Sequence, residues 1–143
     1  MLFRSKRFNM DIEPFLLASS ISGVVGLRLV RKNCPFCAEP YQPEPSLLRA
    51  VPREDLENAS FRKGVGCKEC SFTGFSGRYA ITEMLVVNEV LRDAIMQKLP
   101  TRSLQEVANQ QGMQMLWQTG LRRALTGQTP LEEILRVVAV DQF

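Results

Sequence analysis

The sequence predicts an α+β fold, mostly α-helical, in which a two-knuckle cysteine module with short strands precedes a small C-terminal helical bundle. Three observations support this prediction. All four cysteines fall in two C-x-x-C pairs, "CPFC" and "CKEC". The stretch "RYAITEMLVV" alternates apolar and polar residues as a strand does. Beyond it, apolar residues recur at the spacing of amphipathic helices nearly to the end of the chain.

Composition limits the function. A chain of 143 residues suits one compact domain or two small modules. Its formal net charge of +3 is too small to imply a nucleic-acid or membrane partner by itself. The sequence has no histidine, which excludes Ser/His/Asp and Cys/His catalysis and most catalytic zinc sites.

The N-terminal residues raise the alternative of a secretory signal peptide. A basic start, "MLFRSKRF", precedes the apolar stretch "PFLLASSISGVVGLRLV". Against this alternative, Asp11 and Glu13 separate the two parts, and the apolar stretch ends in basic residues, not in a small-residue cleavage site. The stretch is also too short and too polar for a bilayer, which needs about 20 apolar residues. We therefore expect a cytoplasmic chain.

The first element expected is a helix over residues 14–31. Pro14 suits its first turn, and apolar residues recur near helical spacing at Phe15, Leu16, Ala18, Ile21, Val25 and Leu29. Gly23 and Gly26 lower its intrinsic propensity, so packing would have to support it. Between the cysteine pairs the chain is rich in proline and acidic residues, and only short helices over 46–50 and 53–58 are expected.

The second half is expected to hold a strand over 78–87 and then three or four helices. Asn88 is a suitable N-cap for the first helix. The segment "SLQE" matches a capping box for the second, which Gly112 ends. A stripe of apolar residues from Met113 to Leu125 forms the third helix, and "TPLEE" supplies the start of the last.

The two cysteine pairs predict a structural zinc site. Structural Zn²⁺ is held by four tetrahedral ligands at about 2.3 Å, and each C-x-x-C turn places two sulfurs on one side of such a site. Lysines at positions 32, 63 and 68 would offset the double negative charge of a zinc tetrathiolate. The ligands predicted for one structural Zn²⁺ are Cys34, Cys37, Cys67 and Cys70.

Several alternatives to this site remain. Two disulfides would need an oxidising compartment, and a thioredoxin-like C-x-x-C would need a strand-to-helix setting. The loop between the pairs exceeds the roughly 15–20 residues of the usual zinc template. A free-standing zinc-ribbon module that binds protein or nucleic acid is a further alternative, because basic residues and phenylalanines cluster around the cysteines. "CKECSFTG" also resembles one repeat of the chaperone cysteine-rich domain, but that domain needs several repeats.

Three segments together resemble a known family: "DIEPFLLASSISGVVGLRLVRKNCPFC", "KGVGCKECSFTGFSGRYAITEML" and "GMQMLWQTGLRRALTGQTPLEEILRVV". They are similar to the C-terminal part of the assembly ATPases of type II secretion and type IV pili. The resemblance implies that residues 1–31 are the end of a RecA-like ATPase core. Residues 32–78 would be its tetracysteine zinc module, and residues 79–143 a C-terminal strand and helical domain.

The resemblance also places single residues. Arg28 and Arg31 correspond to the arginine-bearing helix end that precedes the first cysteine of the family. Leu27 stands where the family usually has glutamine, and residues 9–11, Asn-Met-Asp, depart from its acidic residue and Met-Gly.

For complete members, the resemblance implies a hexamer that uses ATP and Mg²⁺ to drive the assembly of pilin-like subunits. Its partners would be the cytoplasmic domains of inner-membrane platform proteins, through which it is peripheral to the membrane; no nucleic acid is expected. This sequence contains no G-x-x-x-x-G-K-[ST] loop to cradle ATP phosphates. We therefore expect the zinc-binding C-terminal portion of such an ATPase, unable to hydrolyse ATP alone.

Overall fold

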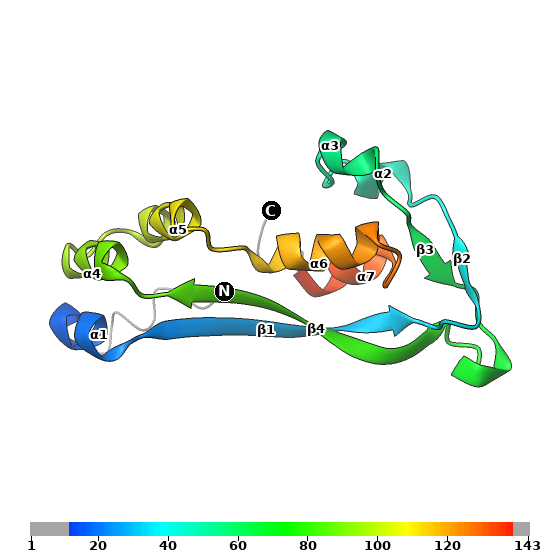
Figure 1. The fold of residues 1–143 in the computed structure, drawn as a ribbon, viewed down its shortest axis with the longest axis horizontal. Helices are drawn as coiled ribbons and strands as arrows, with labels where there is room; N and C mark the ends of the chain where they lie inside the picture. The colour runs from blue at the N-terminus through cyan, green and yellow to red at the C-terminus, as the bar shows by residue number, and fades with distance from the viewer. Residues whose placement is uncertain (1–11, 139–143) are drawn as a thin grey trace. The chain divides into compact units, whose positions relative to one another are not determined.

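A computed structural model describes residues 12–138, which form two compact units interleaved along the chain (Figure 1). Of the described residues, unit 1 consists of 12–26 together with Glu83–Met115, and unit 2 consists of Leu27–Thr82 together with 116–138. The basic start of the chain and the family departures at residues 9–11 lie outside the described residues. Strands β1 (Gly23–Asn33) and β4 (Phe75–Val86) pair with each other, and each contributes to both units.

Unit 1 contains three helices packed on the first part of β1 and the last part of β4. The helices are α1 (Pro14–Ser20), α4 (Glu89–Met96) and α5 (Thr101–Gln110). Its buried core consists of Leu85, Val87, Leu91, Ala94, Leu104 and Ala108. Asn88 caps α4 as predicted, since its side-chain Oδ1 accepts from the backbone N–H of Leu91 at 3.0 Å.

The prediction of a helix over residues 14–31 is confirmed only as far as Ser20 and is wrong for the residues that follow. The chain turns extended at Ile21, and residues 23–33 form β1. Valines at positions 24, 25 and 30 favour a strand, and the two glycines weaken a helix. The deciding factor is that residues 23–33 pair with β4.

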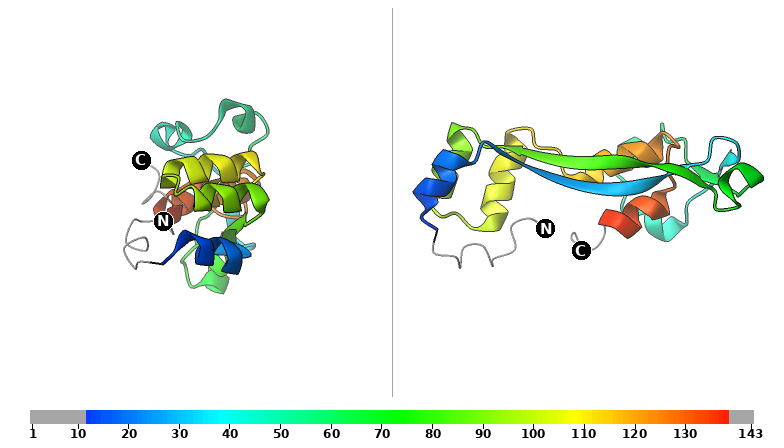
Figure 2. Two further views of the ribbon diagram at one scale, coloured as in Figure 1. Left: turned by 90° about the vertical axis from the view of Figure 1, so that its left-hand side faces the viewer. Right: turned by 90° about the horizontal axis from the view of Figure 1, so that it is seen from below.

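Unit 2 contains the rest of the paired strands, the cysteine turns and four helices. Their bounds are β2 (Ala38–Pro40), α2 (Pro45–Leu48), α3 (Arg53–Leu56), β3 (Arg62–Gly64), the 3₁₀ turn η2 (Lys68–Cys70), α6 (Leu116–Leu125) and α7 (Leu131–Val138). Its buried core consists of Val30, Val51, Ile81, Leu121, Ala124, Leu131, Ile134 and Val138. Helices α6 and α7 pack closely on each other (Figure 2), because Gly120 leaves room for Ile134.

These elements confirm the predicted fold class, α+β with more helix than strand. The strand expected over 78–87 is present and begins three residues earlier, at Phe75. Two predicted helix starts are wrong in detail. Helix α5 begins at Thr101, ahead of the "SLQE" box, and α7 begins after Pro130, where the buried hydroxyl of Thr129 has no hydrogen-bond partner within residues 12–138. Across the same residues, no helix combines the length and the apolar character needed to cross a membrane.

Candidate metal centre

The first cysteine turn lies between β1 and β2. Strand β1 ends at Asn33, and the backbone then turns tightly enough for the Cys37 N–H to donate to the Cys34 carbonyl at 3.4 Å. Strand β2 follows at once and pairs antiparallel with β3, with Ala38 opposite Gly64. This register carries the chain after β3 past the first turn, where the Val65 N–H donates to the Cys37 carbonyl at 3.0 Å.

The second cysteine turn is η2 and the residues after it. The Cys70 N–H donates to the Cys67 carbonyl at 3.2 Å, and the Phe72 N–H donates to the same carbonyl at 2.8 Å. Ser71 and Phe72 both have positive φ, 51° and 60°, a region that non-glycine residues rarely adopt. The resulting turn points the cysteine sulfurs back toward the first pair.

Two glycines allow the turns to approach each other. A Cβ on Gly64 would overlap the carbonyl of Gly74, and a Cβ on Gly74 would overlap the carbonyl of Gly64. The Cys34 N–H also donates to the Gly74 carbonyl at 2.9 Å. The two cysteine turns are therefore held together by backbone contacts that only glycine permits at these positions.

The four cysteines predicted as ligands come together as a cluster, with all sulfurs within 4.8 Å of one another. The Sγ atoms of Cys34 and Cys67 lie 3.8 Å apart, as do those of Cys37 and Cys70, and those of Cys67 and Cys70 lie 3.7 Å apart. A tetrahedron of sulfurs at 2.3 Å from a central zinc has edges of about 3.8 Å. The sulfur spacing therefore fits a tetrathiolate zinc site, whereas a disulfide would need about 2.05 Å.

Backbone N–H groups also point at the sulfurs. Gly66 donates to the Cys37 sulfur at 3.3 Å, and Cys67 and Gly74 donate to the Cys70 sulfur at 3.2 and 3.3 Å. The bonds from Cys67 and Gly74, led by the one from Cys67, lower the pKa of the Cys70 thiol to about 6, whereas burial raises the pKa of the Cys37 thiol to about 12. Four thiolates this close repel one another, so full ionisation needs a bound cation.

The lysines predicted to offset the thiolate charge mostly have other partners. Lys32 Nζ lies 4.1 Å from the centre of the Tyr79 ring, and Lys63 Nζ pairs with Glu132 Oε1 at 3.4 Å. Lys68 is exposed on η2 beside Cys67. Of the three, Lys68 alone belongs to a cysteine turn.

The two arginines singled out by resemblance lie in a strand and have different surroundings. Arg28 is exposed, and its guanidinium donates to the carbonyl of Leu27. Arg31 donates through Nη2 and Nε to the Glu133 carboxylate at 2.7 and 3.1 Å and stacks 4.0 Å from the centre of the Phe75 ring. Arg31 therefore joins β1 to α7 in unit 2.

Sequence reasoning missed two buried polar residues, one beside the first cysteine turn and one on α7. The Asn33 amide donates to the carbonyls of Arg62 and Gly127 at 2.7 and 2.9 Å and accepts from the Gly64 N–H at 3.3 Å. Glu133, on α7, accepts from both Arg31 and Arg136. The one hint of a role for Asn33 in the sequence is its position directly before the first cysteine. The sequence does not reveal that Asn33 is buried, because its burial depends on segments that are distant in the chain.

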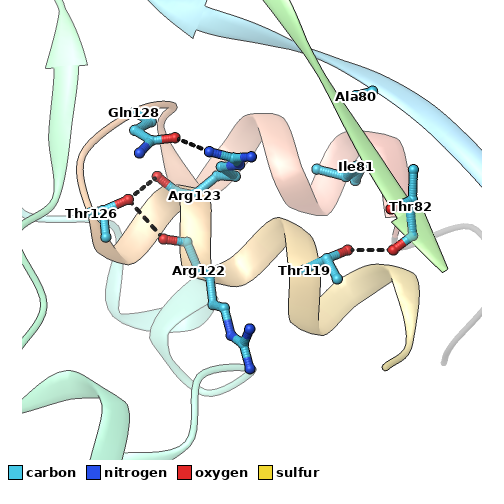
Figure 3. Close-up of a pocket in the computed structure, with 8 residues that line it drawn as sticks. All are labelled: Ala80, Ile81, Thr82, Thr119, Arg122, Arg123, Thr126 and Gln128. Carbon is cyan, nitrogen blue, oxygen red and sulfur yellow. Dashed lines mark hydrogen bonds between the residues drawn. The ribbon is translucent and has the colours of Figure 1, made fainter. Parts of the chain in front are cut away.

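A shallow depression of about 330 Å³ in unit 2 lies away from the cysteines (Figure 3). Two of its hydroxyl groups are hydrogen-bonded: Thr119 donates to the Thr82 carbonyl at 2.9 Å, and Thr126 donates to the Arg122 carbonyl at 2.9 Å. Arg123 donates to Gln128 at 2.7 Å and lies over the Tyr79 ring. These bonds tie α6 to β4 and to the turn that follows α6.

Comparison with known proteins decides the family. The sequence profile described as "Type II/IV secretion system protein" matches residues 5–136, which is most of the chain. The chain belongs to this type II/IV secretion system protein family. The family match spans both cysteine pairs and reaches into α7.

Relatives within the secretion system family come from both pilus assembly and secretion. The chain is 40% identical over 128 residues to "Type IV pilus assembly ATPase PilB" of Thermus thermophilus, covering 88% of this chain and 14% of the relative. It is 34% identical over 142 residues to the protein of that name in Myxococcus xanthus, covering 97% and 25%. It is 34% identical over 131 residues to "Putative type II secretion system protein E" of Escherichia coli, covering 92% and 26%. The chain thus spans about a quarter or less of the length of these relatives.

Proposed function

We propose that this chain is the zinc-binding C-terminal portion of a secretion or pilus assembly ATPase, and that Cys34, Cys37, Cys67 and Cys70 bind one structural Zn²⁺. The observation that carries the zinc assignment is the spacing of 3.7–3.8 Å between three pairs of the sulfurs, which matches the edge of a zinc tetrathiolate. The N–H groups of Gly66, Cys67 and Gly74 would stabilise the ionised sulfurs once the metal is bound.

The metal would fasten a region that has little core of its own. Among the residues described, the cluster around the cysteine turns consists of the cysteines themselves. Binding free energies of about 10–16 kcal/mol for structural zinc exceed the stability of most domains, so the metal would decide whether these turns fold.

The role in the complete ATPase is proposed from family membership. In a longer family member, a core with a phosphate-binding loop would bind ATP and Mg²⁺, and a hexamer would transmit its motion to inner-membrane platform proteins from the cytoplasmic side. The zinc module would present a rigid surface for their cytoplasmic domains. This sequence has no such loop, so we expect no ATP hydrolysis by the chain alone.

Cobalt substitution tests the metal part of this proposal. Co²⁺ added to the metal-free chain should give thiolate-to-cobalt charge-transfer bands that saturate at one ion per chain. Cys67→Ser should weaken these bands and lower the affinity, whereas the matched surface change Ser76→Ala should leave both unchanged. Saturation at two ions, or bands indifferent to Cys67→Ser, would contradict a single four-sulfur site.

Nucleotide binding tests the second part. Isothermal titration of the purified chain with ATP and Mg²⁺ should give no measurable heat of binding, because no loop in the sequence cradles phosphates. Micromolar affinity for ATP would show that the chain carries a nucleotide site of its own and would contradict its role as an accessory portion.

A further inference from the structure

The four cysteine sulfurs differ in the hydrogen bonds that they accept. The Gly66 N–H donates to the Cys37 sulfur at 3.3 Å, and two backbone N–H groups donate to the Cys70 sulfur at 3.2 and 3.3 Å. Within residues 12–138, no backbone N–H donates to the sulfur of Cys34 or Cys67. A hydrogen bond to a thiolate lowers its nucleophilicity as it lowers its pKa. In the fully ionised cluster, Cys34 and Cys67 therefore carry the more nucleophilic sulfurs.

Access to solvent separates Cys67 from the other three cysteines. Those three are buried: Cys34 is 0% exposed, Cys37 is 8% exposed and Cys70 is 7% exposed. Cys67 is only partly buried, at the start of the 3₁₀ turn η2, and the next residue, Lys68, is exposed. The oxidation of a thiolate follows its exposure and its thiolate character, so a small dissolved oxidant should react first with Cys67.

Cys34 is placed to form a disulfide with Cys67 across the two cysteine turns. Their Sγ atoms lie 3.8 Å apart and would have to approach to about 2.05 Å. Cys70 is as near, with its Sγ 3.7 Å from that of Cys67. The sulfur of Cys70, however, accepts two N–H bonds that reduce its nucleophilicity, whereas the sulfur of Cys34 accepts none from the backbone of the described residues. These hydrogen bonds favour Cys34 as the partner.

We propose that Cys67 is a modification site for peroxides and that its oxidation links it to Cys34, an inference that rests on the proposed zinc site. First, the Cys67 thiolate attacks a peroxide oxygen: an S–O bond forms, the O–O bond breaks and hydroxide leaves. Next, the Cys34 thiolate attacks the Cys67 sulfur: an S–S bond forms, the S–O bond breaks and a second hydroxide leaves. The two thiolates lose two electrons, and hydrogen peroxide with two protons becomes two water molecules.

The Cys34–Cys67 disulfide would leave two of the four sulfurs free to bind metal. Cys37 and Cys70 would remain as thiolates, but two ligands hold structural Zn²⁺ far more weakly than four. Among the residues described, the cluster at these turns consists of the cysteines themselves, so loss of the metal would loosen the turns. Disulfides in the cytosol are usually transient, catalytic or redox-sensing. Peroxide would thus switch the zinc module off, and a dithiol reductant would restore it.

Peptide mapping of the zinc-loaded chain identifies the disulfide. The chain is treated with hydrogen peroxide, its remaining thiols are alkylated, and it is digested with trypsin without a reductant. Cleavage after Lys63 and Lys68 places Cys67 on the peptide "GVGCK", separate from "ECSFTGFSGR", which carries Cys70. The first cysteine pair lies on a third peptide, residues 33–49.

We expect mass spectrometry to find "GVGCK" linked to residues 33–49 through Cys34, with Cys37 alkylated. Zinc release, followed with a metal-binding dye, should keep pace with this link. A link between "GVGCK" and "ECSFTGFSGR" would place the disulfide within the second turn and would overturn the proposal. So would a product that dithiothreitol does not reverse, because it would be a sulfinic or sulfonic acid.

Two matched variants, Cys67→Ser and Cys37→Ser, each remove one sulfur from the cluster. They are compared with enough zinc present to load both equally. Peroxide should consume the remaining thiols about tenfold more slowly in Cys67→Ser than in Cys37→Ser, which keeps both reactive sulfurs. Equal rates would contradict the role given to Cys67. The peptide map uses the unaltered chain and holds whether or not these variants fold.

Metal content before the addition of peroxide separates this proposal from the zinc site on which it rests. A chain that binds no zinc would contradict both. A zinc-loaded chain that keeps its metal in peroxide, or that loses its metal without the Cys34–Cys67 link, would overturn the peroxide site alone and leave the zinc site in place.

Discussion

The buried carboxylate of Glu133 gives a quantitative test of how unit 2 is held together. Its side chain is 2% exposed and accepts from Arg31 Nη2 at 2.7 Å and from Arg136 Nη2 at 2.8 Å. Burial alone would raise its pKa, but the hydrogen bonds from Arg136 and Arg31 outweigh burial and lower the pKa to about 2. A fall from about 4.3 in the unfolded chain corresponds to about 3 kcal/mol.

We expect Glu133→Gln to lower the free energy of unfolding by about 2 kcal/mol at pH 7. The figure is reduced from 3 because both guanidinium groups are about half exposed, so that water screens them. Urea unfolding followed by circular dichroism measures the change. The matched control is Glu106→Gln, which breaks an exposed pair with Arg102 and should cost less than about 0.5 kcal/mol.

The sign of the pH dependence follows from the lowered pKa of Glu133. Its contribution is fully present above about pH 4.3 and is lost as the pH falls toward 2. The difference between the unaltered chain and Glu133→Gln should therefore shrink over that window, and acid effects on the cysteines, common to both proteins, cancel. A loss at pH 7 no larger than that of the control, or a difference that persists at pH 2, would refute the reasoning.

Three further predictions concern the support of the cysteine turns. Asn33→Ala removes the partner of the buried Gly127 carbonyl and should lower the free energy of unfolding by about 3 kcal/mol in urea titrations; a loss below about 1 kcal/mol would contradict the role given to Asn33. Gly64→Ala forces a methyl group onto the Gly74 carbonyl, so it should destabilise the chain by about 3 kcal/mol and weaken metal affinity in competition with a chelator; unchanged affinity would show that the turns need not approach so closely. Phe72→Gly removes an exposed ring at positive φ and should raise the thermal midpoint, with a gain of about 1 kcal/mol; a lower midpoint would show that the ring packs within the chain.

The cysteine site was predictable because its signal is local and complete. Two C-x-x-C pairs with no cysteine left over, such as Cys34 with Cys37, specify a two-by-two arrangement whatever loop separates them. The structure brings the sulfurs to tetrahedral spacing, although metal binding itself stays a prediction. Asn88 was also predictable, since a cap depends only on the three residues that follow it.

The sequence predicts a helix in place of strand β1 because the apolar residues of this segment fit both the helical period and the two-residue period of a strand. Val25 and Leu29 fit helical spacing, but they also alternate with inward-facing neighbours along a strand. The choice is made by β4, which lies about fifty residues further along the chain, a separation that local periodicity does not sense. The sequence also fails to predict buried polar groups such as Glu133, because tertiary packing determines their hydrogen-bond partners.

The division into three consecutive segments, 1–31, 32–78 and 79–143, stays a prediction. Helices α4 and α5 join unit 1, whereas α6 and α7 join unit 2. The units alternate along the chain because both strands of the β1–β4 pair contribute residues to both units. Sequence composition does not indicate this division.

The most direct test of the central claim is the metal content of the purified chain, measured by elemental analysis together with a chelator melt. We expect one zinc per chain, and cooperative loss of structure in unit 2 when the chelator removes it. A chain that is folded without metal, with its four cysteines paired as disulfides, would contradict the structural zinc site and favour the oxidising-compartment alternative.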